Sequence, residues 1–371
     1  MLRRASALLP ALALLWFGAA TALAAGPTWT LAVSENPSDQ ANYLTAASML
    51  SGTDAWAVGA WYRPASTPGT LTEHWDGATW TAVPSPNATQ GYNELFDVHA
   101  IATDDVWAVG YHNIANYGSE KSMTLHWNGA TWKIVRSVNI GANANILRGV
   151  AGASSNDVWA VGLGNSTSLQ SGRPLVEHWN GTAWSIGRSP NTSQAFAQLE
   201  ALSVISSNDV WAVGVAGGKT LAEHWDGTAW TVVSSPNGPG GRGELSSVSA
   251  FATTDVWAVG TAGGKTLTEH WDGTAWTVVS SPNGTLPTSS LTGVVALSGN
   301  DAWAVGVTEN QLLVSIKTLT LHWDGSVWSV VPSPNPGPDY NWLDGVAALS
   351  GGDVWAVGNQ DEQTLAMSAS D

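Results

Sequence analysis

The chain has 371 residues, no cysteine, and 29 acidic against 13 basic residues, which gives a formal net charge of −16. The absence of cysteine excludes disulfide cross-links and thiolate metal sites. The acidic balance argues against nucleic acid or anionic lipid as a partner, because both carry negative charge themselves. We therefore expect no nucleic-acid partner, and nothing in the sequence calls for a cofactor or a metal ion.

The first 24 residues have the order of a secretory signal peptide. Arg3 and Arg4 come first, an apolar run occupies residues 8–17, and Ala22-Leu23-Ala24 supplies a small-x-small cleavage site. The alternative is a membrane anchor, but the run is short for a membrane span and no second run of spanning length follows. We expect a secreted, extracellular protein without a membrane span. Processing would leave 11 basic and 29 acidic residues, a formal charge of −18.

After a short predicted strand at residues 28–33, the chain is built from a repeat. The hexapeptide Asp-(Val/Ala)-Trp-Ala-Val-Gly occurs seven times, at spacings of 46 to 52 residues. Its tryptophans are Trp56, Trp107, Trp159, Trp211, Trp257, Trp303 and Trp355. A period of this length is typical of four-stranded propeller blades. The sequence therefore predicts an all-β fold, a seven-bladed β-propeller that forms one domain over residues 27–371.

The copy around Trp257 shows how one blade is predicted to be made. Residues 245–251 alternate apolar with small or polar side chains, residues 256–260 are rich in β-formers, and residues 266–271 and 276–280 flank an Asp-Gly hairpin signal. Pro282 then ends the pairing. Each such unit contributes four strands, numbered here from the channel outward.

The two ends of the repeat predict how the ring closes. The last hexapeptide is followed only by residues 364–367, which we interpret as an incomplete third strand. Residues 28–33, Thr-Trp-Thr-Leu-Ala-Val, match a fourth strand that has no strands before it. The N-terminal strand should pair with the C-terminal three, because closure removes a free sheet edge.

The repeated histidines and tryptophans have a structural interpretation. Six copies of His-Trp-(Asp/Asn)-Gly follow the hexapeptides, and each is followed by another tryptophan. Six histidines spread around a ring cannot converge on one metal ion, so we expect each to bond within its blade or to the turn aspartate, such as Asp54 or Asp105. We expect the tryptophans to pack between blades, with each indole N–H finding a local partner.

These motifs resemble the kelch repeat of galactose-oxidase-type propellers. Val-Trp-Ala-Val-Gly, then Trp-Asp-Gly-Thr-Ala-Trp at residues 225–230, then a strand ending in proline follow the kelch pattern. The departures are a glycine doublet in only two blades and tryptophan in place of the usual tyrosine. The chain is less closely similar to the Asp-box repeats of sialidase-type propellers. Neither resemblance implies a particular activity, because propellers host many functions.

Function is predicted on the face formed by the variable loops, which run from strand two to three and from strand four to the next blade. The tyrosines lie in or beside these loops, and the first residue after each strand-one leucine should approach the channel. Arg148 and Glu200 stand at that position in neighbouring blades, and the alternative to ligand binding is that they only form an ion pair. For the aromatic residues, the alternative to ligand binding is that they anchor their own loops. The candidate ligand-binding residues are Trp61, Tyr62, Tyr92, Tyr111, Tyr117, Arg148, Phe196, Glu200, Tyr340, Trp342 and Asp344.

No catalytic signature is present, since neither an arginine cluster, a nucleophile elbow nor a phosphate loop occurs. The leading hypothesis is a secreted, monomeric, non-enzymatic recognition module for a glycan or an extracellular protein. One alternative is a glycoside hydrolase or lyase that uses carboxylates of the variable face. Those carboxylates are Glu94, Glu120, Glu200, Glu244, Glu309, Asp339, Asp344 and Asp361. A structural surface protein is the third possibility.

Overall fold

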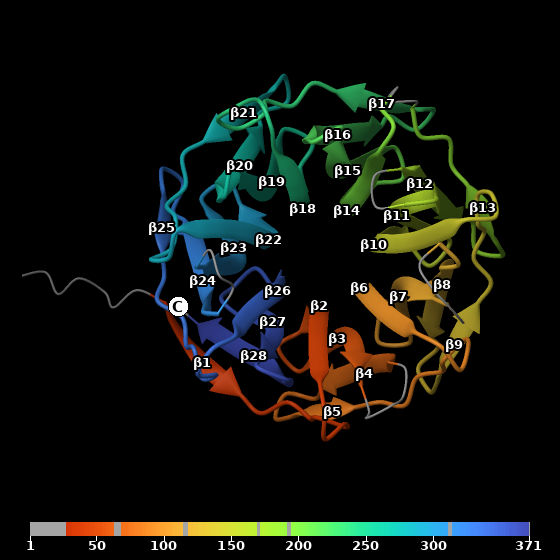
Figure 1. Cartoon of the computed structure of the whole chain (residues 1–371), viewed down its shortest axis with the longest axis horizontal. Coiled ribbons are helices and arrows are strands. Elements are labelled where there is room, and N and C mark those ends of the chain that lie inside the picture. The colour runs from red at the N-terminus through yellow and green to blue at the C-terminus, as the bar shows by residue number, and fades with distance from the viewer. Residues whose placement is uncertain are drawn as a thin grey trace, which may run out of the picture.

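The structure is a computed structural model that describes residues 27–62, 68–113, 118–168, 171–190, 194–310 and 314–370. Seven four-stranded antiparallel sheets stand around a central channel as a seven-bladed β-propeller, so the predicted fold class is confirmed (Figure 1). In the part of the chain that is described, no helix has the length and apolar character needed to cross a membrane. The predicted signal peptide and Tyr117 lie outside the described residues.

The blades are numbered in chain order, and their strands are given from the channel outward. Blades 1 to 3 are β2 (Asn42–Ser51), β3 (Asp54–Trp61), β4 (Gly69–Trp75), β5 (Trp80–Ala82); β6 (Asn93–Ala102), β7 (Asp105–His112), β8 (Lys121–Trp127), β9 (Trp132–Val135); β10 (Ala144–Ser154), β11 (Asp157–Ser166), β12 (Arg173–Trp179), β13 (Trp184–Ile186). Blades 4 and 5 are β14 (Ala197–Ser206), β15 (Asp209–Ala216), β16 (Lys219–Trp225), β17 (Trp230–Val233); β18 (Glu244–Ala252), β19 (Asp255–Ala262), β20 (Lys265–Trp271), β21 (Trp276–Val279). Blades 6 and 7 are β22 (Thr288–Ser298), β23 (Asp301–Glu309), β24 (Ile316–Trp323), β25 (Trp328–Val330); β26 (Asn341–Ala348), β27 (Val354–Gln360), β28 (Gln363–Ser370), β1 (Thr28–Ala32).

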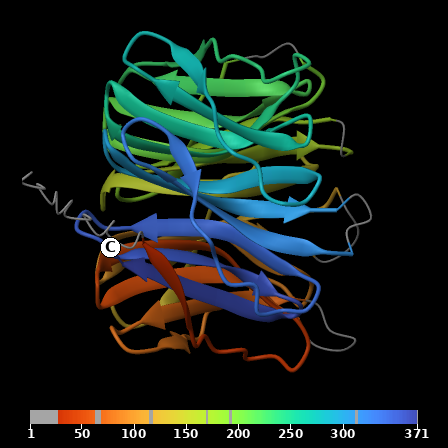
Figure 2. The same cartoon turned by 90° about the vertical axis from the view of Figure 1, so that its left-hand side faces the viewer.

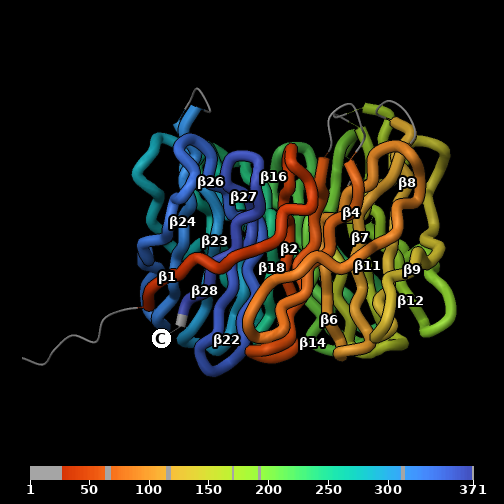
Figure 3. The backbone as a smooth tube through the Cα atoms, turned by 90° about the horizontal axis from the view of Figure 1, so that it is seen from below, coloured from red at the N-terminus to blue at the C-terminus, as the bar shows by residue number. Residues whose placement is uncertain are grey.

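The N-terminal strand closes the ring, as predicted. β1 pairs antiparallel with β28, with Trp29 opposite Ala369, and the two lie side by side at the rim (Figures 2 and 3). The expectation of an incomplete third strand in blade 7 was wrong, because β28 is full length. Ser368 and Ala369 stand where other blades have histidine and tryptophan, and backbone pairing with β27 needs neither side chain.

A belt of tryptophans joins every blade to the next. The hexapeptide tryptophan of each blade meets the fourth-strand tryptophan of the following blade edge to face, with ring centroids 5.0 to 5.4 Å apart and interplanar angles of 81 to 90°. This geometry is favourable for aromatic pairs. The tryptophan belt consists of Trp29, Trp56, Trp80, Trp107, Trp132, Trp159, Trp184, Trp211, Trp230, Trp257, Trp276, Trp303, Trp328 and Trp355.

The expectation about indole N–H partners holds for one set of tryptophans and fails for the other. Third-strand tryptophans donate to a carbonyl of the turn between the first two strands, as Trp75 does to Gly52 at 3.0 Å and Trp271 to Thr253 at 3.2 Å. Twelve of the belt tryptophans, in contrast, bury an indole N–H that has no hydrogen-bond partner among the described residues. Their rings pack edge to face against the tryptophan of the neighbouring blade instead.

The histidines bond to the turn aspartates, as predicted. His Nε2 lies 2.7 to 3.0 Å from aspartate Oδ1 in each of the six pairs. Each imidazole also packs against the belt tryptophan of its own blade, with centroids 4.7 Å apart for His74 and Trp56 and 4.6 Å for His270 and Trp257. The repeated histidines therefore hold the turn that precedes the second strand.

Four seams between blades also contain a buried glutamate, at the position directly before the histidine. These seam glutamates are Glu73, Glu177, Glu223 and Glu269, all with no solvent exposure. Three accept a hydrogen bond from a serine of the preceding blade at 2.7 to 3.0 Å, and Glu177 accepts one from the Val138 backbone N–H at 3.0 Å. Burial raises their pKa to about 8, 8, 7 and 7 in chain order. The equivalent residues of blades 2, 6 and 7 are Leu125, Leu321 and Met367.

Candidate functional site

A β-bulge in each innermost strand directs one side chain into the channel. In β2, Leu44 pairs with Gly59 and Ala46 with Val58, so Thr45 has no partner. The hexapeptide glycine makes this possible, because a Cβ on Gly59 would collide with the Tyr43 carbonyl. Bulges re-aim side chains in this way. The seven residues at the bulge are Thr45, Phe96, Arg148, Glu200, Ser246, Thr292 and Asp344, and all line the channel, a cavity of about 370 Å³.

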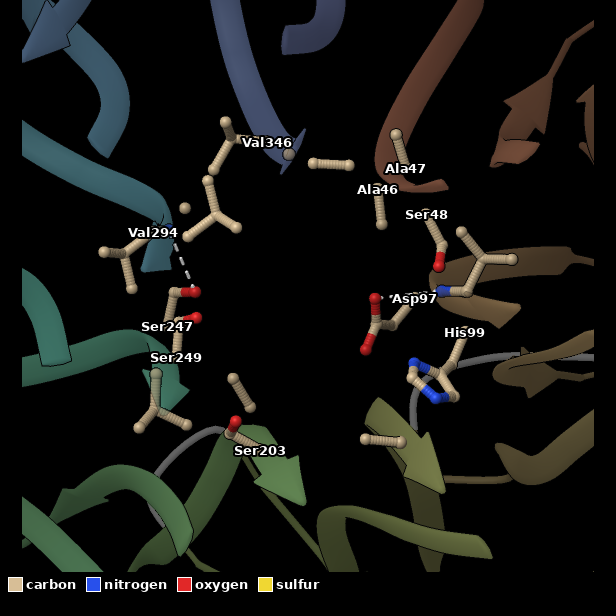
Figure 4. Close-up of a pocket in the computed structure, with 18 of the residues that line it drawn as sticks. Ala46, Ala47, Ser48, Asp97, His99, Ser203, Ser247, Ser249, Val294 and Val346 are labelled. Carbon is tan, nitrogen blue, oxygen red and sulfur yellow. Dashed lines mark hydrogen bonds between the residues drawn. The ribbon is translucent and has the colours of Figure 1, made fainter. Parts of the chain in front are cut away.

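Deeper in the channel, the polar side chains tie blades together. Ser247 Oγ accepts from the Val294 N–H at 3.2 Å, and Asp97 Oδ2 accepts from the Val150 N–H at 2.8 Å. Figure 4 shows Asp97 and His99 on one wall of the channel and Ser247 and Ser249 opposite. His99 Nε2 donates to the Gly152 carbonyl at 3.3 Å, and burial raises the pKa of Asp97 to about 7. The polar side chains of the deep channel therefore have a structural role, because they join neighbouring blades.

At the loop end of the channel, which we call the channel mouth, two tyrosines converge on one carboxylate. The Tyr62 hydroxyl donates to Glu94 Oε1 at 2.8 Å, and the Tyr111 hydroxyl also bonds to Glu94. Burial and the adjacent Glu94 raise the pKa of both tyrosines. Tyr43 packs edge to face against Tyr62, with centroids 5.6 Å apart. The rings are therefore held in fixed orientations around Glu94.

A second chain of contacts runs from blade 2 to blade 4. Phe96 stacks on Tyr111 with centroids 5.7 Å apart, and the Arg148 guanidinium lies 4.8 Å from the centre of the Phe96 ring. Arg148 Nε is 3.4 Å from Glu200 Oε2, so the predicted pairing of these two residues is confirmed. Burial raises the pKa of Glu200, and the Arg148 charge opposes that rise. The guanidinium of Arg148 therefore contacts the Phe96 ring and the Glu200 carboxylate.

A small pocket lies where blades 7, 1 and 2 meet. The indole of Trp342 hydrogen-bonds to Asp344, whose pKa is raised by burial to about 7. The pocket has a volume of about 240 Å³, and Glu94 and Asp344 are its two carboxyl groups. We call it the mouth pocket; its lining is Tyr43, Thr45, Ala60, Tyr62, Glu94, Leu95, Phe96, Trp342, Asp344 and Asn359.

The structure brings together six of the candidate residues, and their side chains are all half-buried. These are Tyr62, Tyr111, Arg148, Glu200, Trp342 and Asp344. The predicted ligand-binding residues did not include Tyr43, Glu94 and Phe96, although Glu94 was among the carboxylates of the hydrolase alternative. Their signal is positional, because they stand at the bulge or immediately before the leucine that precedes it.

The other candidates lie further out. Trp61 donates its indole N–H to the Thr70 carbonyl at 3.0 Å, which fixes it inside blade 1. Tyr92 and Tyr340 are 43% and 42% exposed, and with Phe196 they stand outside the linings of the channel and the mouth pocket. Tyr340 lines a neighbouring hollow of about 890 Å³ that shares Tyr43 and Trp342 with the mouth pocket.

In the described ranges, no group of three or more His, Cys, Asp or Glu side chains is arranged so that it could hold a metal ion. Asp344 and Glu200 stand at the bulges of blades 7 and 4, and only Asp344 lines the mouth pocket. Glu94 and Asp344 are therefore the carboxyl pair of the mouth pocket, whereas Glu200 and Asp344 both line the channel.

No protein-family model and no curated protein matches the chain. Solved structures with a similar fold include YCF48 bound to a D1 peptide, at 13% identity and a TM-score of 0.57, covering 93% of this chain and 95% of that one. A GH74 xyloglucanase from Xanthomonas campestris is 12% identical with a TM-score of 0.58, over 91% of this chain and 55% of the enzyme. The extracellular domain of a one-component system protein from B. thetaiotaomicron is 10% identical with a TM-score of 0.56, over 91% of this chain and 39% of the other. At these identities the chain is similar to all three in fold alone, as a β-propeller.

Proposed function

We propose that the protein is a secreted, non-enzymatic recognition module that binds a glycan or an extracellular protein through the channel mouth. The observation that carries the proposal is the bulge position, where the backbone repeats in every blade and the side chain does not. Thr or Ser stands there in blades 1, 5 and 6, whereas Phe96, Arg148, Glu200 and Asp344 stand there in the other four. Rigid scaffolds that present divergent side chains at one end typically use them for binding.

The fold neighbours support a binding role without choosing the ligand. One is a propeller bound to a peptide, and another is an enzyme named for a polysaccharide. A relationship to kelch-type propellers belongs to the same proposal and is supported by the hexapeptide and the Trp-Asp-Gly-x-x-Trp strand pair.

The test begins with glycan arrays and immobilised extracellular proteins and continues with oxidative footprinting of any complex found. Protection is expected at Tyr62, Trp342 and Phe96. The Asp-Gly turns at the opposite end of the blades, such as Asp272-Gly273, serve as the internal control. A complex that protects those turns and leaves the mouth labelled would contradict the proposal.

The outer aromatic residues Tyr92, Phe196 and Tyr340 are proposed to contribute as a rim. Replacing all three by alanine should weaken a bound ligand by about 1–3 kcal/mol for each ring that stacks on it. Folding should be nearly unchanged, because Tyr92 and Tyr340 are exposed. Titration calorimetry and thermal melts measure the two effects separately.

A second candidate function is a glycoside hydrolase or lyase, and one observation favours it. Glu94 and Asp344 line the same pocket, and Asp344 has a pKa raised to about 7, which suits a general acid. Release of reducing ends from polysaccharides, abolished in the Asp344→Asn variant, would support an enzyme. Binding of an oligosaccharide without turnover would support the recognition module.

We also propose where the protein is located and that it is a monomer. Cleavage near Ala24, export and a monomeric state are supported by the order of residues 1–24 and by closure of the sheet edges. N-terminal sequencing of the exported protein and light scattering of the purified chain test these points.

A further inference from the structure

The mouth pocket has two carboxyl groups in its lining, and four of its side chains already use a donor within the protein. Thr45 Oγ1 donates to the Leu95 carbonyl at 3.0 Å, and the Tyr62 hydroxyl donates to Glu94. Trp342 bonds through its indole to Asp344, and Asn359 Nδ2 lies 3.4 Å from the Asp361 carbonyl. The two carboxyl groups are the strongest acceptors of the lining, which favours a ligand that donates hydrogen bonds.

The charge of the pocket points in the same direction. Glu94 and Asp344 carry its two carboxyl groups, and no described lining residue is basic. Asp344, with a pKa of about 7, is partly protonated at neutral pH, and a cation bound beside it favours its charged form. Arg148 is the basic residue of the mouth cluster, and it is held between Phe96 and Glu200. Formal charge across the whole chain is −16, so a cation is attracted from a distance as well as at the site.

Aromatic rings complete the pocket on several sides. Tyr43 and Tyr62 meet at an interplanar angle of 82° and form a corner, while Phe96 and Trp342 come from the blades on either side. Ring faces attract cations, and the attraction grows when the cation is partly removed from water. A volume of about 240 Å³ is smaller than pockets that hold whole drug-sized molecules. It is suited to the end of one side chain.

We propose that the mouth pocket binds a primary ammonium group, the end of a lysine side chain on a protein partner. An ammonium has three donors and no acceptor, which matches a pocket whose strongest acceptors are two carboxyl groups. A neutral sugar hydroxyl accepts as well as donates and gains less from two carboxylates. This inference rests on the proposed recognition function and narrows its partner to a protein.

The experiment uses the peptide acetyl-Gly-Lys-Gly-amide and its Nζ-acetylated form, with binding followed by ligand-observed NMR. The lysine peptide should bind, and the acetylated peptide should bind at least about tenfold more weakly because it lacks the charge. Asp344→Asn and Glu94→Gln should each weaken the lysine peptide by about tenfold, and both variants keep the shape of the pocket and an acceptor oxygen at the substituted position. Circular dichroism melts establish that each variant is folded.

Glu244→Gln is the matched control. Glu244 occupies in blade 5 the position that Glu94 occupies in blade 2, directly before the bulge leucine, and it lies outside the mouth pocket. The Glu244→Gln substitution removes the same charge as Glu94→Gln. If the mouth pocket binds the lysine peptide, Glu244→Gln should leave that binding unchanged. Equal binding of both peptides, or equal weakening by all three variants, overturns the lysine proposal.

The outcomes also separate this inference from the function on which it depends. If the lysine peptide fails to bind and a neutral oligosaccharide protects Tyr62 and Trp342 from oxidation, the lysine inference is wrong and mouth recognition stands. If the lysine peptide binds and protects only the Asp-Gly turns, both are wrong.

Discussion

The tryptophan belt and the channel mouth are built by the same seven blades and follow opposite rules. In the belt, each seam repeats one contact with one residue type, from Trp56 against Trp132 to Trp303 against Trp29. At the mouth, each contact occurs once, as with Tyr62 on Glu94 or Arg148 on Glu200. Identical contacts at every seam hold a ring together, whereas contacts that differ from blade to blade create one particular place on it.

The comparison predicts where mutations should cost stability. A repeat protein is stabilised by the interfaces between neighbouring units, so a change in the belt weakens a seam on which closure depends. The mouth side chains are half-buried, and four of them stand at bulges without a partner in the strand register, namely Phe96, Arg148, Glu200 and Asp344. Changes there should alter binding and spare the fold.

The largest effect is expected from removing the closing strand. Deleting Thr28–Ala32 removes β1, buried Trp29 and its edge-to-face packing on Trp303, and it leaves β28 as a free edge. Cooperative unfolding should disappear and the protein should aggregate, as measured by calorimetry and light scattering. A monomeric deletion variant with an unchanged melting curve would contradict the role of closure.

A single belt substitution should come next. Trp257 is 1% exposed, so Trp257→Ala should lower the free energy of unfolding by about 3–5 kcal/mol in urea titrations. Tyr92→Ala, an aromatic truncation on the exposed mouth side, should stay within about 0.5 kcal/mol of the parent. Similar losses of stability for the two variants would remove the distinction between belt and mouth.

The seam glutamates predict an unusual dependence of stability on pH. Their folded pKa of about 7 to 8 lies above the ordinary 4.5, so between these values the folded state holds protons that the unfolded chain releases. The contribution is therefore fully present below about pH 4.5 and is lost as the pH rises through 8, by about 1.4 kcal/mol per pKa unit at most for each residue. Asp97 and Asp344, with pKa about 7, act in the same direction.

The aspartates of the Asp-Gly turns limit that gain on the acid side. Hydrogen bonds lower the pKa of Asp226, Asp272 and Asp324 to about 2, so their stabilisation is lost as the pH falls through that value. Melting temperature should therefore be highest near about pH 4–5. Replacing all four seam glutamates by glutamine should flatten the decline above about pH 5, and a parent that melts highest near pH 8 would contradict the burial argument.

The smallest effect is expected from the partly exposed ion pair of the mouth. Arg148 and Glu200 are 33% and 22% exposed in their side chains, so solvent screens their attraction. A double-mutant cycle with Arg148→Gln and Glu200→Gln should give a coupling free energy of no more than about 1 kcal/mol in urea titrations. A larger coupling would place this pair among the contacts that hold the ring.

The sequence alone determined the architecture, because the same blade pattern occurs seven times along the chain. The seven hexapeptide copies predict the number of blades, and the unpaired strand at residues 28–33 predicts closure. The repeated histidine predicts a bond to the aspartate that begins the hexapeptide, as between His270 and Asp255. Such contacts depend on strand register and nearest neighbours, which a local pattern encodes.

Only the tertiary structure decided which side chains meet at the mouth. Trp342 and Phe96 are far apart in sequence and line one pocket because ring closure places blade 7 beside blade 1. The bulges that aim side chains inward arise where a glycine lets two backbones approach, a feature that shows in the register and not in any single strand. The ring that each belt indole meets belongs to a neighbouring blade, so this contact likewise depends on how the seams pack.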